Sequence, residues 1–97
     1  MQSLFQDIQN LSLHEKKSLL QRMVKLQEEC GELAQEVLIH TNASGSQYKE
    51  KKEDTLKKEC VDILLVVLSI YFQEKGSVDE LFSLLYEKKE KWKKHQQ

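Results

Sequence analysis

The fold is decided by the stretch CVDILLVVLSIYF, residues 60–72, which is apolar on almost every side when it is wound into an α-helix. A helix with apolar side chains all round is buried all round in its native state. The stretch is too short to cross a bilayer and contains Asp62, so we expect no membrane association. We expect it to form the second half of a helix from about residue 49 to 75, whose first half is charged.

The composition of the whole chain favours an all-α fold in one domain, residues 1–97. The chain has no proline and 3 glycines, so it lacks the residues that make the tight turns of a small β-domain. Its net charge of −1, from 15 basic and 16 acidic residues, argues against a nucleic-acid polymer as partner. The N-terminus has no secretory signal and only 2 cysteines occur, which predicts reduced thiols and a cytoplasmic location.

Capping signals divide the rest of the chain into three further helices. With the apolar helix these make four, so we expect a four-helix bundle. Ser12 with Glu15, and Ser77 with Glu80, have the spacing of a capping box. Gly76 supplies a stop for the preceding helix. A polar loop follows the second helix. The predicted helices span residues 2–10, 12–40 and 78–94.

A bundle of this size cannot enclose a helix that is apolar on every side with its own three other helices. We therefore expect the apolar helix to pack against another copy of the chain, in a homodimer or a homotetramer. The fourth helix is amphipathic, with its apolar side chains on one side: Leu81, Phe82, Leu85, Tyr86 and Trp92.

Two groups of acidic residues are spaced along their helices in a way that brings no local stabilisation. The second helix carries Glu28, Glu29, Glu32 and Glu36 on one face, and the third carries Glu59 and Asp62 at i, i+3 spacing. If the two helices are antiparallel neighbours, these carboxylates converge, and several converging carboxylates need a compensating cation. A set of oxygen donors suits Mg²⁺ or Mn²⁺.

An alternative explanation is that lysines neutralise these acids as ordinary ion pairs. The candidates are Lys25, Lys57 and Lys58. The chain would then be a non-catalytic helical interaction module whose apolar third helix binds a partner. A di-iron bundle fits poorly, because it requires a histidine three residues after a glutamate on two helices, and no histidine here has that spacing.

The two acidic groups belong to a wider pattern. The chain carries LQEECGEL at residues 26–33 and ECVDIL at residues 59–64. These runs resemble the EExxE…ExxD signature of the MazG-like all-α nucleoside triphosphate pyrophosphohydrolases, and the resemblance extends from about Ser18 to Lys94. It implies Mg²⁺-dependent hydrolysis of (deoxy)nucleoside triphosphates to the monophosphate and pyrophosphate, in nucleotide-pool cleansing. The same chemistry on phosphoribosyl-ATP or on a modified nucleotide stays open.

The resemblance also implies roles for individual residues. Four carboxylates would hold the metal: Glu29, Glu32, Glu59 and Asp62. Glu28 would orient or deprotonate the attacking water. Four lysines would meet phosphate: Lys49, Lys52, Lys89 and Lys93. The chain departs from the family pattern at Tyr86, where asparagine is usual, and at Lys93, where arginine is usual. These departures concern recognition of the base and leave the metal motif intact.

Two cysteines stand beside the motif acids in sequence, Cys30 after Glu29 and Cys60 after Glu59. We expect both to be small buried side chains on the seam between the helices. A zinc site would need more sulfur and imidazole ligands than this chain offers.

Overall fold

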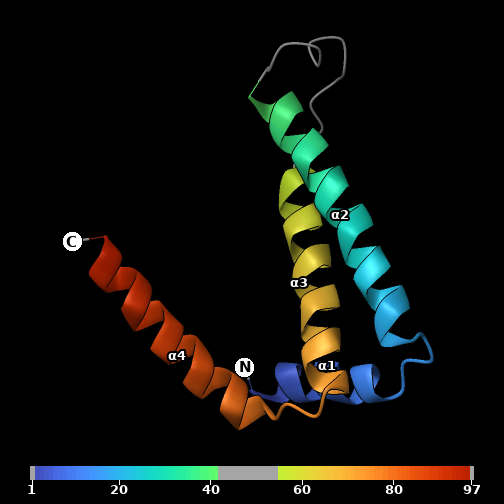
Figure 1. Cartoon of the computed structure of the whole chain (residues 1–97), viewed down its shortest axis with the longest axis vertical. Coiled ribbons are helices and arrows are strands. Elements are labelled where there is room, and N and C mark those ends of the chain that lie inside the picture. The colour runs from blue at the N-terminus through green and yellow to red at the C-terminus, as the bar shows by residue number, and fades with distance from the viewer. Residues whose placement is uncertain (1, 42–54, 97) are drawn as a thin grey trace.

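The computed structural model describes residues 2–41 and 55–96, which form four α-helices and confirm the all-α prediction. The helices are α1 (Gln2–Leu13), α2 (Leu19–His40), α3 (Thr55–Gln73) and α4 (Val78–His95). Figure 1 shows α2 and α3 side by side and antiparallel, with α1 across one end of the pair and α4 directed away from it. The predicted loop and the predicted start of the third helix fall on residues 42–54, outside the described residues. No described helix is long and apolar enough to cross a membrane.

The boundary between α1 and α2 differs from the prediction. Ser18 caps α2: its hydroxyl accepts from the Gln21 backbone N–H, and the Gln21 side chain accepts from the Ser18 N–H at 2.8 Å. Ser12, the expected cap, lies buried inside α1 and its hydroxyl donates to the Ile8 carbonyl at 2.7 Å. Two capping-box spacings occur within ten residues of each other, and the second begins the helix because the first hydroxyl is used within α1.

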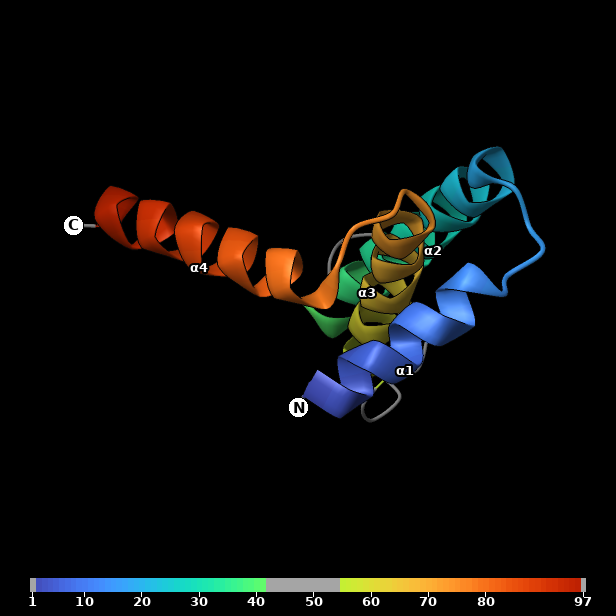
Figure 2. The same cartoon turned by 90° about the horizontal axis from the view of Figure 1, so that it is seen from below.

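The core lies where α1 and the first turn of α4 meet the C-terminal end of α3. Its buried members are Leu68, Phe72, Val78 and Leu81, and the partly buried side chains packed on them are Phe5, Ile8, Tyr71 and Phe82. The rings of Phe5 and Phe82 pack edge to face, with their centroids 5.2 Å apart. Beyond this core α4 contacts neither α2 nor α3, as Figure 2 also shows, so the described part of one chain leaves α4 outside the bundle.

The connection between α3 and α4 is fixed by Tyr71. Its hydroxyl donates to the Ser77 carbonyl at 2.9 Å, and the Ser77 side chain caps α4 as predicted by accepting from the Glu80 N–H. Helix α3 ends at Gln73, before the predicted stop at Gly76, and the glycine has a steric role instead, because a Cβ at this position would overlap the Tyr71 ring. The residue with a left-handed backbone is Lys75, with φ of 73°.

We expect Gly76→Ala to lower the free energy of unfolding by about 1–3 kcal/mol, because the new methyl displaces the Tyr71 ring and its hydrogen bond. Gly31→Ala is the matched control: no atom lies within 4 Å of a Cβ there, and alanine in a helix is favoured over glycine by about 1 kcal/mol. Urea denaturation of both variants measures the two effects. Equal stabilisation by both changes would contradict the steric role of Gly76.

Candidate metal centre

The seam between α2 and α3 contains two buried carboxyl groups. Glu29 is 6% exposed and is the only buried residue of α2, and Glu59 on α3 is 9% exposed. With Asp62, one turn after Glu59, they form a group whose candidate ligand atoms all lie within 4.8 Å of one another. Asp62 is exposed, so the group opens to solvent on its side. The structure therefore brings together three of the four predicted metal ligands.

The carboxyl groups of Glu29 and Glu59 shift each other's pKa in opposite directions. The hydrogen bond to Glu29, then burial, then the charges of Glu29 and Glu32 raise the pKa of Glu59 from its ordinary value of 4.5 to about 7. The hydrogen bond with Glu59, followed by that with Lys25, lowers the pKa of Glu29. In the absence of a cation, a proton on this pair is therefore favoured on Glu59 over Glu29.

One lysine partly supports the ion-pair alternative. Lys25 Nζ lies 2.9 Å from Glu29 Oε1, and the lysine side chain is 47% exposed. This ion pair compensates the charge of one carboxylate only. Glu59 Oε1 is buried and has no hydrogen-bond partner, which is costly for a polar oxygen. The pair with Lys25 therefore leaves the buried half of the cluster unsatisfied.

A divalent cation fits this donor set. Three carboxylates from two helices supply only oxygen atoms, as Mg²⁺ and Mn²⁺ prefer, and one of these oxygens has no other partner. Beside the cluster, a surface hollow of about 390 Å³ is lined by Lys57, Lys58, Val61 and Asp62. A ligand in this hollow would meet one carboxylate and two lysines, all from α3.

The remaining predicted site residues occupy three different places. Glu32 is exposed one turn after Glu29, near enough for its charge to act on Glu59, although it lies outside the 4.8 Å group. Glu28 is also exposed on α2. The predicted phosphate ligands divide into Lys49 and Lys52, which lie outside the described residues, and Lys89 and Lys93, which lie on the projecting helix α4. Lys89 Nζ stands 4.2 Å from the Tyr86 ring centroid.

The prediction that the two cysteines are buried is wrong, because both Cys30 and Cys60 are exposed. Each follows a buried glutamate directly, and neighbouring residues on a helix point about 100° apart. When Glu29 and Glu59 point into the seam between the helices, the residue that follows each of them therefore points outward.

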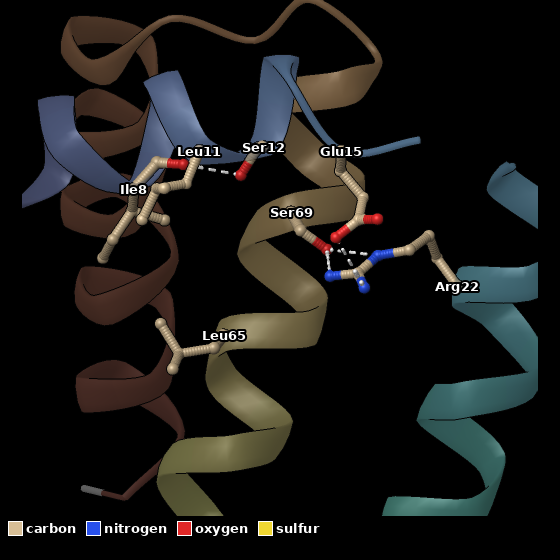
Figure 3. Close-up of a pocket in the computed structure, with 7 residues that line it drawn as sticks. All are labelled: Ile8, Leu11, Ser12, Glu15, Arg22, Leu65 and Ser69. Carbon is tan, nitrogen blue, oxygen red and sulfur yellow. Dashed lines mark hydrogen bonds and ion pairs between the residues drawn. The ribbon is translucent and has the colours of Figure 1, made fainter. Parts of the chain in front are cut away.

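A second polar group, which the sequence analysis missed, fixes α2 against α3 and against the connection that follows α1. Figure 3 shows Arg22 of α2 reaching Ser69 of α3 beside Glu15. Arg22 Nε donates to Ser69 Oγ at 2.9 Å, Ser69 donates to the Val66 carbonyl, and the guanidinium lies 3.7 Å from the Glu15 carboxylate. The available signal was that Arg22 is the only arginine of a lysine-rich chain.

The comparison with known families agrees with this geometry. The family model described as the MazG nucleotide pyrophosphohydrolase domain matches residues 16–96. The match covers most of the chain, so the chain belongs to the MazG nucleotide pyrophosphohydrolase family, and the resemblance drawn from the acidic motifs is confirmed. No curated protein and no solved structure matches the chain.

The raised pKa of Glu59 predicts a pH dependence of stability without divalent cations. The unfolded chain loses the Glu59 proton near pH 4.5, whereas the folded chain holds it to about 7, so the folded state binds more protons between these values. The free energy of unfolding should therefore fall as the pH rises from 4.5 to 7. The lowered pKa of Glu29 acts in the opposite sense, but below this range.

Urea denaturation in EDTA across this range measures the slope for the native chain and for Glu59→Gln, in which we expect it to be lost. Glu87→Gln, the same change at an exposed residue of α4, is the control and should keep the slope. A native slope that Glu59→Gln leaves intact would show that the proton resides elsewhere.

Proposed function

We propose that this chain hydrolyses nucleoside triphosphates, among them deoxynucleoside triphosphates, to the monophosphate and pyrophosphate with the help of Mg²⁺. The carrying observation is the convergence of Glu29, Glu59 and Asp62 within 4.8 Å, with a buried oxygen of Glu59 left without a partner. The match to a family of nucleotide pyrophosphohydrolases supports the reaction class. The biological role that follows is the removal of unwanted nucleotides from the cellular pool.

In this proposal the metal is held by Glu29, Glu59 and Asp62, with Glu32 joining them by a change of side-chain rotamer. Bound Mg²⁺ supplies charge that offsets the triphosphate and makes a coordinated water more acidic. Mn²⁺ suits the same oxygen ligands. The protein's part is to hold four carboxylates on two packed helices, so that their spacing does not depend on a loop.

The proton of the attacking water requires a base, and we assign this role to Glu28. It precedes Glu29 directly on α2 and is exposed, so its carboxylate is open to solvent. Water then attacks the α-phosphorus, a new P–O bond forms on the nucleoside monophosphate, and the bond to the leaving pyrophosphate breaks. The lysines proposed to meet the phosphates are Lys49, Lys52, Lys89 and Lys93.

The first test is an assay of pyrophosphate release from each of the four dNTPs and four NTPs, with Mg²⁺ or with EDTA. We expect release with Mg²⁺ only, and a preference for one base. A protein that is stabilised by Mg²⁺ yet inactive on all eight would indicate phosphoribosyl-ATP or a modified nucleotide as substrate. Inactivity together with no Mg²⁺ binding would favour the non-catalytic interaction module.

Variants separate the proposed metal ligands from the proposed base. Mg²⁺ at a hundredfold excess over its dissociation constant should stabilise the native chain by about 2.7 kcal/mol. Asp62→Asn and Glu32→Gln should lose both this stabilisation and turnover while remaining folded, because they relieve repulsion. Glu28→Gln should keep the stabilisation and lose turnover by about 10²–10⁴-fold. Full turnover in Asp62→Asn would show that the site is assigned wrongly, and thermal unfolding supplies the binding measurement.

A further inference from the structure

One side of the α2–α3 pair carries the exposed charged residues that surround the acidic cluster. Glu29 and Glu59 meet across the seam, and their two helices are antiparallel, as Figure 1 shows. In two right-handed helices that run in opposite directions, residues at the same offset from two facing positions project to the same side of the pair. Glu28, directly before Glu29, and Lys58, directly before Glu59, therefore share one side, and both are exposed.

The two other exposed acids of the site lie on this side as well. Glu32 and Asp62 each follow one of the facing glutamates by three residues, which is about 60° short of a full helical turn, so they project to the same side as Glu28 and Lys58. The two cysteines, directly after each glutamate, project to the opposite side. A substrate that reaches the cluster from the acidic side therefore has Glu28 of α2 at one flank and Lys58 of α3 at the other.

Lys58 does not neutralise the acids beside it. It stands one turn before Asp62 on α3, at the i, i+4 spacing of helical ion pairs, yet it forms no ion pair with any described residue. The lysine that pairs with a buried carboxylate of the cluster is Lys25 of α2. The Lys58 side chain lines the hollow of about 390 Å³ together with Asp62, so its charge is available to an anion bound there.

We propose that Lys58 binds the pyrophosphate as it leaves, in the hollow that this lysine forms with Asp62. The inference rests on the proposed function and adds a residue to it. In phosphoryl transfer the attacking and leaving oxygens lie roughly in line, on opposite sides of the phosphorus. With Glu28 activating the water at the α2 flank, the leaving oxygen points to the α3 flank, where Lys58 is exposed.

The charge of Lys58 compensates the charge that develops in this step. When the bond between the α-phosphorus and the bridging oxygen breaks, its electron pair stays on that oxygen, which becomes part of the pyrophosphate, while the proton of the attacking water passes to Glu28. A lysine ammonium offers several N–H donors to phosphate oxygens, and hydrogen bonds between charged groups are about twice as strong as those between neutral groups. The flexible lysine side chain can follow the pyrophosphate out of the hollow.

Substitution of Lys58 separates this role from a general weakening of the acidic charge. We expect Lys58→Gln to lower kcat/KM for the best substrate of the eight nucleotides by about 10–100-fold, because a hydrogen bond to a charged group is lost. Stabilisation by Mg²⁺ alone should persist or increase, because removal of a positive charge beside Asp62 favours a cation there. Lys58→Arg should keep kcat/KM within a few fold. Lys91→Gln, the same charge change at an exposed residue of α4, is the control and should leave it unchanged.

Binding of inorganic pyrophosphate gives a readout that does not need turnover. With Mg²⁺ present, isothermal titration should show pyrophosphate binding to the native chain and to Lys91→Gln, and binding at least about tenfold weaker to Lys58→Gln. Unchanged pyrophosphate binding or unchanged kcat/KM in Lys58→Gln would overturn the role of Lys58 and leave the proposed hydrolysis standing. A native chain that is inactive on all eight nucleotides, yet binds pyrophosphate through Lys58, would overturn the hydrolysis and keep the pyrophosphate site. A native chain with neither activity nor pyrophosphate binding would overturn both.

Discussion

The structure depends on the close approach of two buried carboxyl groups, Glu29 of α2 and Glu59 of α3. Burial of carboxyl groups is costly, and this chain reduces the cost by keeping a proton on one of them and pairing the other with Lys25. The position of greatest burial on α2 is thereby occupied by an acid, where a leucine would stabilise the fold more. Such a sacrifice of stability is typical of a functional site.

Because Glu59 is part of this buried pair, α3 consists of two parts, one that carries the acidic residues and one that forms the core. Its first turns carry Glu59 and Asp62, and its last turns carry Leu68 and Phe72, of which Phe72 alone is fully enclosed. The core of one chain is therefore small and lies at one end. Arg22 extends the attachment of α2 with a polar link to Ser69, instead of with apolar packing. A small core next to a charged seam leaves apolar area open, and the projecting α4 adds to it.

Much of this could be read from the sequence, because the signals are local. Helical periodicity and the absence of proline gave the four helices, and the i, i+3 spacing of Glu59 and Asp62 placed them on one face opposite Glu29. Three kinds of error arose where two local signals compete or where the outcome depends on distant contacts. Ser12 and Ser18 compete as caps of α2. Cys30 is exposed although Glu29 beside it is buried, because adjacent residues of a helix point in different directions. The direction of α4 depends on how Tyr71 packs on Gly76.

The raised pKa of Glu59 could not be predicted from the sequence either, because it depends on the distance between side chains across the seam of α2 and α3. It also reconciles the two explanations of the acidic cluster. Lys25 compensates the charge of Glu29, and the raised pKa of Glu59 favours the neutral form of that carboxyl group, so both reduce the negative charge that a cation would otherwise balance. In the proposed function a divalent ion would displace the proton and relax the lysine pair, so that ion pairing and metal binding would be successive states of one cluster. Glu59 Oε1 stays without a hydrogen-bond partner among the described residues, and in the proposed function a metal ion would supply that contact.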